Sequence, residues 1–563
     1  MTRRRPLLAL LALLAAALLG VAAAAPSSAR ESLTIGLTQY PSTLNPMIDS
    51  MLAKSYVLGA AHRQLTIEGH DWTPVCQLCV KLPSLEDGDA VRFPSKTEAG
   101  APVDGVRKTY TLRDDAFWAD GTPVTADDVV FAWEVGRHPD TGVANFRAYR
   151  DVLDIEVHGP KRFTLVERKL DYRYRSAGDF QVLPAHIERP AFEVPREYRN
   201  RTLYQTDPTN PGLWNGPYRV VQVETGSRIG LARNEHWKGP RPAFDRVEIR
   251  AIENTSALEA NLLSGSIDMI AGELGLAVDQ AIAFEKRHGD TYTVLYQPGL
   301  VYEHLDVMLD NPVLADRRVR QALILAVDRQ AINDRLFAGK QPVADTNVHP
   351  LDWVNATVGV PTYGFEPERA KALLDEAGWT VGPKGTRVNA QGETLTIELM
   401  TTAGNRTREL IQQVLVDYWK RIGVEARPRI ELAQVFFGET VQKRRFTGLA
   451  MFAWLSAPES LPRTTLHSES IPTEANNWAG QNATGFRNAE MDRLIDAAEI
   501  ELDRDKRKAL WAEMQRVYAV ELPAIPLYFR TEPYILPKWL TGIRPTGHKY
   551  STTNWIEDWQ VAE

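Results

Sequence analysis

Two cysteines, Cys76 and Cys79, are the residues of this chain whose spacing most directly suggests chemistry. A C-x-x-C pair forms a local disulfide in an oxidising compartment, or a redox centre where it stands at the start of a helix. The nearby prolines Pro74 and Pro83 are typical of a loop, so we expect cysteines with a structural role. A zinc site would need two more ligands, and the neighbouring residues supply none.

The acidic and histidine residues show no catalytic spacing. Asp114 and Asp115, like Asp127 and Asp128, are sequence neighbours, and such neighbours do not face each other on a helix. No two of the eleven histidines lie three or four residues apart, as a metal site on a helix would require. Phosphate-loop, dinucleotide-binding, nucleophile-elbow and zinc-protease motifs do not occur. We therefore expect no enzyme, no cofactor and no metal, with a secreted hydrolase as the remaining alternative.

The composition is that of an ordinary globular protein. The chain has 563 residues, of which 44% are hydrophobic and 24% charged, and its formal net charge is −7. These fractions exclude a disordered chain and a polytopic membrane protein. The charge balance gives no indication of a nucleic-acid partner. At this length we expect about three or four domain-sized units.

The N-terminal segment has the three parts of a secretory signal. Arg3, Arg4 and Arg5 precede an apolar run from 7 to 25, and small residues follow from 26 to 29. This order predicts a signal peptide over residues 1–25, with an uncleaved membrane anchor as the alternative. We therefore expect a periplasmic protein.

Helix and strand patterns alternate along the rest of the chain. Residues 33–37 alternate between apolar and polar, which predicts a strand. Residues 218–224 and 228–233 flank a short glycine-containing turn and predict a hairpin. Thr125 with Asp128 forms a capping box, which predicts the start of a helix. The sequence therefore predicts an α/β protein with mixed sheets.

Several longer motifs occur in a fixed order. Residues 110–129, YTLRDDAFWADGTPVTADDV, contain a D-G-x-P-x-T-A-x-D-V core, and shorter motifs follow at 215–218, 263–268, 316–329 and 370–378. Together they resemble the extracytoplasmic solute-binding proteins of ABC importers, in the oligopeptide- and dipeptide-binding family (bacterial solute-binding protein family 5). The resemblance extends from about Ser32 to Arg544.

The resemblance implies a two-lobed periplasmic-binding-protein fold with a hinge. It places the first lobe at 32–66, 213–297 and 525–563, an inserted subdomain of that lobe at 67–212, and the second lobe at 298–524. Two chain crossings, near 296–303 and 526–530, would form the hinge, and a small-molecule or peptide ligand would lie in the cleft. The resemblance also implies a monomer that docks on an ABC-transporter permease with separate ATPase subunits.

The segment 453–457, Ala-Trp-Leu-Ser-Ala, resembles the family segment that reaches into the cleft. The resemblance implies that Trp454 packs against an apolar part of the ligand, with Ser456 beside it; a core position is the alternative for Trp454. Peptide-binding members commonly carry an aspartate where this chain has Ala457. A buried ammonium needs a counter-charge. Either Glu459 or Asp49 therefore holds the ligand amine, or the ligand has no free amine.

Three further aromatic residues are candidates for the cleft. Trp478 follows two asparagines in the second lobe, and Tyr302 and Tyr528 fall in the two hinge segments. Packing within the hinge is an equal alternative for the two tyrosines. We expect the ligand to be a peptide or a similar small polar solute. An opine, a sugar, a metal chelate or haem is the alternative, which Ala457 favours.

Overall fold

The computed structural model describes residues 30–48, 51–97, 100–145, 147–178, 180–252, 254–403, 405–432, 435–476 and 480–562. The predicted signal peptide and two candidate ligand residues, Asp49 and Trp478, lie outside the described residues. Within the described part, no helix has both the length and the apolar character needed to cross a bilayer.

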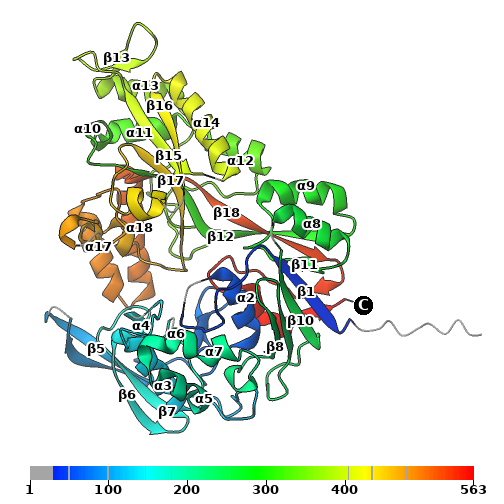
Figure 1. Ribbon diagram of the computed structural model, residues 1–563. Coiled ribbons are helices and arrows are strands. Elements are labelled where there is room, and N and C mark those ends of the chain that lie inside the picture. Colours follow the sequence, from blue (N-terminus) through cyan, green and yellow to red (C-terminus); the bar gives the residue numbers. More distant parts are fainter. Residues whose placement is uncertain are drawn as a thin grey trace, which may run out of the picture.

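A ten-stranded mixed sheet runs through both lobes (Figure 1). Its central strands are β12 (Tyr292–Val307) and β18 (Ala524–Pro537), which pair antiparallel. On one side of them lie β17 (Leu449–Leu455), β15 (Thr396–Thr402) and β16 (Glu425–Glu431). On the other side lie β11 (Met269–Ile270), β1 (Ser32–Leu37), β10 (Arg246–Ala251), β9 (Arg228–Arg233) and β8 (Tyr218–Glu224).

The two halves of this sheet support separate cores. One hydrophobic cluster contains Leu33 and Val247 from the β1–β10 half, and another contains Leu399 and Leu449 from the β15–β17 half. The β12–β18 ladder shifts register between Pro298 and Tyr302, in the segment predicted to form the hinge. We call the half with β1 the first lobe and the half with β17 the second lobe.

Local sequence signals gave the correct elements in the first lobe. The expected strand at 33–37 is β1, and the expected hairpin consists of β8 and β9. Gly226, in the turn between them, has φ +79°, a backbone conformation that favours glycine. These two predictions are confirmed.

A second sheet has four antiparallel strands in the order β4–β5–β7–β6. It lies within residues 67–212, the range predicted as an inserted subdomain, and we use that name for this range. These strands are β4 (Ala90–Lys96), β5 (Pro102–Thr111), β6 (Val152–Gly159) and β7 (Arg162–Glu167). Helix α3 (Ala126–Arg137) starts where the capping box predicts. The Asp128 carboxylate accepts a hydrogen bond from the Thr125 backbone N–H at 2.8 Å. The 110–129 motif therefore has a structural role.

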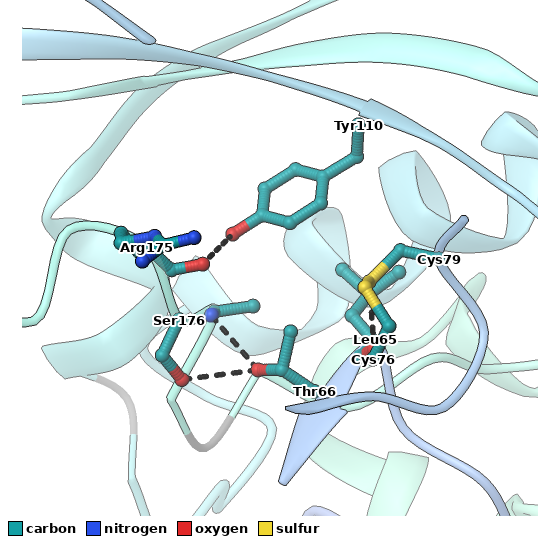
Figure 2. The surroundings of a disulfide bond; sticks show 8 residues. Leu65, Thr66, Cys76, Cys79, Tyr110, Arg175 and Ser176 are labelled. Carbon is teal, nitrogen blue, oxygen red and sulfur yellow. Dashed lines mark hydrogen bonds between the residues drawn. A yellow bond between two sulfur atoms is a disulfide. The ribbon is translucent and has the colours of Figure 1, made fainter. Parts of the chain in front are cut away.

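Cys76 and Cys79 form a disulfide (Figure 2), which fits the structural role expected for them. Pro74–Cys76 is strand β3, so the expected loop is wrong on this side of the pair. The Sγ atom of Cys79 lies 3.3 Å from the Leu65 carbonyl oxygen. Next to Leu65, the Thr66 hydroxyl accepts a hydrogen bond from the Ala177 backbone N–H at 2.9 Å. The disulfide thus stabilises the β2–β3 hairpin (Thr66–Glu68 and Pro74–Cys76) where it contacts another segment of the inserted subdomain.

Candidate ligand-binding site

The second lobe contains a cavity over one face of the β12–β17 ladder. Its volume, which includes the part open to solvent at its mouth, is about 740 Å³. Its wall contains both hydroxyl or amide side chains and apolar ones, and Ser456, Ser460 and Leu461 come from the loop after β17. The cavity therefore has the mixed lining of a site for a small polar solute with apolar parts.

Strand alternation determines which side chains face this cavity. Successive residues of a strand point to opposite faces, so Tyr302, His304 and Asp306 share one face of β12. Trp454, at the end of β17, lies on the same face and also lines the cavity. The cross-strand pairs are Tyr302 with Trp454, His304 with Phe452, and Asp306 with Ala450.

Two predicted ligand residues, Tyr302 and Trp454, are therefore neighbours at the cavity. Trp454 is partly buried, and its ring packs edge-on against Phe452 with centroids 5.2 Å apart. Tyr302 is buried and shares a hydrogen bond with the Tyr518 hydroxyl at 2.7 Å. Burial raises the pKa of both tyrosines, so both hydroxyls are neutral.

Tyr528 does not line this cavity. The β12–β18 ladder shifts register between Glu303 and His304, and this shift pairs Tyr528 with Glu303. Glu303 points to the opposite face from His304, and the Tyr528 ring packs against Phe337 in the core of the second lobe. Burial raises the pKa of Tyr528. The irregular pairing, which the sequence does not reveal, turns this hydroxyl away from the expected position.

Glu459 is bound by protein groups and does not line the cavity. Its carboxylate accepts hydrogen bonds from Arg507 Nε and, at 3.2 Å, from Trp353 Nε1. Its backbone N–H donates to Asp352 Oδ2 at 2.9 Å. Burial raises the pKa of Glu459, and the bond to Arg507 opposes that effect. A ligand amine could therefore pair with Glu459, as predicted, only in competition with the salt bridge between Glu459 and Arg507.

The loop that contains Glu459 also contacts the inserted subdomain. The Tyr172 hydroxyl donates a hydrogen bond to the Glu459 carbonyl oxygen at 2.5 Å. The Tyr172 backbone N–H donates to the Glu499 carbonyl oxygen at 3.1 Å, and Lys169 forms a salt bridge with Glu499 at 2.6 Å. In Figure 1 the inserted subdomain accordingly lies under helix α17 (Ala489–Ile500) of the second lobe.

Most of the cavity lining was not predicted, including His304, Asp306 and Tyr518. His304 and Asp306 lie two residues apart on a strand, so the alternation in the sequence could have shown that they share a face. Tyr518 comes from helix α18 (Arg504–Glu521), more than two hundred residues away, and no local signal connects it with Tyr302. Ser456 lines the cavity, whereas Ala457 is a partly buried residue of the adjoining loop.

A family model matches about two thirds of the chain. The model described as "Bacterial extracellular solute-binding proteins, family 5 Middle" matches residues 102–470. The chain belongs to this family. Family 5 proteins are substrate-binding components that work with ABC permeases and are not enzymes.

Individual family 5 relatives are distant but cover most of the chain. The oligopeptide-binding protein AppA of Bacillus subtilis is 26% identical over 455 residues, which are 79% of each chain. The oligopeptide-binding protein of Thermus thermophilus, solved with a pentapeptide, is 28% identical with a TM-score of 0.70 and coverage of 94% and 96%. NikA from Brucella suis, solved with Fe(III)-EDTA, shares the fold at 20% identity, with a TM-score of 0.76 and coverage of 94% and 99%. The two-lobed fold is thereby confirmed.

Proposed function

We propose that this protein is the extracytoplasmic, periplasmic subunit of an ABC importer that captures peptides in the second-lobe cavity and delivers them to a membrane permease. The observation that carries the proposal is the cavity wall itself. It combines an aromatic ring, Trp454, with the paired hydroxyls of Tyr302 and Tyr518 and with Ser456. Such a wall suits a ligand that has both amide groups and apolar side chains.

The loop after β17 gives a physical route from ligand binding to lobe closure. Ser456, Ser460 and Leu461 line the cavity, while Glu459 in the same loop contacts Tyr172 of the inserted subdomain. A ligand that orders this loop would favour the state in which the lobes touch. Closure would then be a population shift, caused by contacts that are made only in the closed state.

A metal chelate is the second candidate, because the fold is shared with NikA solved with Fe(III)-EDTA. An anionic chelate would need a cationic partner, since a buried charge without one is costly. Among the described residues that line the cavity there is no lysine or arginine. The lining therefore favours a peptide over an anionic chelate.

Native mass spectrometry of the freshly purified protein tests the proposal. We expect a bound molecule of peptide mass that leaves on denaturation and stays unchanged on incubation with the protein. Added at 100 times its dissociation constant, it should stabilise the fold by about 2.7 kcal/mol. A bound sugar or chelate would support the alternative solutes, and chemical conversion of the ligand would support the hydrolase.

A further inference from the structure

Asp306 is the acidic residue among the described residues that line the second-lobe cavity. Only 5% of its surface is exposed, yet it is part of the cavity wall. His304 lines the cavity beside it, and no described lysine or arginine does so. The charge that the cavity presents to a ligand therefore depends on the hydrogen-bond partners of Asp306 and His304.

Within the described part of the chain, no group donates a hydrogen bond to the Asp306 carboxylate. His304 Nε2 lies 3.1 Å from Asp306 Oδ1, but this contact lacks hydrogen-bond geometry, and Nε2 has no hydrogen-bond partner among the described residues. His304 Nδ1 contacts the Tyr302 carbonyl oxygen at 3.2 Å. A carbonyl oxygen only accepts, so Nδ1 is the donor in that contact, and Nε2 is the ring nitrogen left to accept a hydrogen bond. Nε2 is buried without a hydrogen-bond partner among the described residues, and such an unsatisfied atom is costly.

The strands on both sides of Asp306 leave space around its carboxylate. Its cross-strand partner on β17 is Ala450, and its partner on β18 is Ala524. Directly opposite residues have closely spaced Cβ atoms, so a larger side chain at either position would crowd the carboxylate. Ala524 itself lines the cavity.

We propose that Asp306 receives a protonated amine of the bound solute, with His304 Nε2 as a second acceptor beside it. A primary ammonium has three N–H donors, enough for both acceptors and for a neighbouring hydroxyl. An anionic group at the same place would meet the carboxylate without a compensating cation. The inference rests on the proposed function, because it takes the second-lobe cavity as the place where a peptide binds.

Two peptide pools test the inference. One is a randomised tripeptide pool without lysine and arginine, so that the amino terminus is its cation; the other is the same pool N-acetylated. Each is titrated against the wild type, Asp306→Asn and Asp417→Asn, with affinity measured by native mass spectrometry and calorimetry. Asp417 is an exposed carboxylate that pairs with Arg421 on helix α14 (Arg406–Arg421), which makes it the matched control.

We expect the wild type and Asp417→Asn to bind the free-amine pool about 10- to 150-fold more tightly than the acetylated pool, the range for a hydrogen bond to a charged group. Asp306→Asn should lose this preference. Equal binding of both pools by the wild type, or an unchanged preference in Asp306→Asn, would overturn the amine assignment but leave peptide binding intact. If neither pool binds the wild type, the proposed peptide function fails, and the inference fails with it. Equal binding of both pools by the wild type overturns the amine assignment without any variant, so the inference stays falsifiable even if Asp306→Asn does not fold.

Discussion

The Tyr172 hydroxyl lies 2.5 Å from the Glu459 carbonyl oxygen, and this hydrogen bond joins the inserted subdomain to the cavity loop of the second lobe. The Arg507 guanidinium binds the Glu459 carboxylate and also lies over the Tyr172 ring, 5.0 Å from its centroid. Glu459 has φ +52°, a conformation that costs about 1–3 kcal/mol and persists where surrounding contacts determine it. Contacts from both lobes hold this conformation: Tyr172 from the inserted subdomain and Arg507 from the second lobe.

Tyr172→Phe should therefore weaken ligand binding without a change in the cavity itself. The variant loses one hydrogen bond across the lobes, worth about 0.5–1.5 kcal/mol, so affinity should fall about 2- to 10-fold. Calorimetry measures the affinity, and small-angle scattering measures the separation of the lobes, which should increase on average. Tyr174→Phe is the control, because the Tyr174 hydroxyl contacts the Leu85 backbone N–H within the same subdomain. Equal effects of both substitutions would contradict a role for Tyr172 in closure.

The substitution Trp454→Ala tests whether Trp454 contacts the ligand or belongs to the hydrophobic core. Trp454 is partly buried and lines the cavity, whereas its neighbour Phe452 is fully buried. We expect Trp454→Ala to weaken binding of the solute identified by native mass spectrometry at least about 10-fold, because an aromatic ring contributes a large apolar contact area. The melting temperature of the empty protein should change little. Phe452→Ala is the comparison and should destabilise the empty protein by about 3–5 kcal/mol. A similar loss of stability in Trp454→Ala would make Trp454 a core residue.

The sequence predicted those elements whose signals are local. The capping box at Thr125 and Asp128 and the turn at Gly226 each involve residues within a few positions of one another. The role of Glu459 could not be predicted in this way, because its partner Arg507 lies 48 residues further along the chain. The position of Tyr528 depends on a register shift that only strand pairing reveals.

The same reasoning explains why Asp306 was missed. A carboxylate on a strand does not stand out in the sequence, since its environment depends on residues of two neighbouring strands. Ala450 and Ala524, which leave space beside Asp306, are 144 and 218 positions away along the chain. A cavity is a tertiary property, and no period or motif within one segment encodes it.

Replacement of both cysteines by serine tests the structural role of the disulfide. Cys76 and Cys79 close a very short loop, for which the chain-entropy relation gives about 2 kcal/mol of stabilisation. We expect the double variant to lose about that much free energy of unfolding in urea titrations, while ligand affinity stays within about twofold. The wild type under reducing conditions should behave in the same way. A large loss of affinity would show that the hairpin helps to form the binding site.

Glu273 and Glu532 form an acidic pair in the first lobe that should make stability depend on pH. Burial raises the pKa of Glu273 to about 7, and burial together with repulsion from Glu273 raises the pKa of Glu532. Between about pH 4.5 and 7 the folded state thus binds more protons than the unfolded state, so this pair makes stability fall as pH rises. Glu532→Gln removes the repulsion, and its gain in unfolding free energy over the wild type should be larger at pH 8 than at pH 5. Urea titrations at both values measure this, with the exposed Glu513→Gln as the control; an equal gain at both pH values would contradict the coupling.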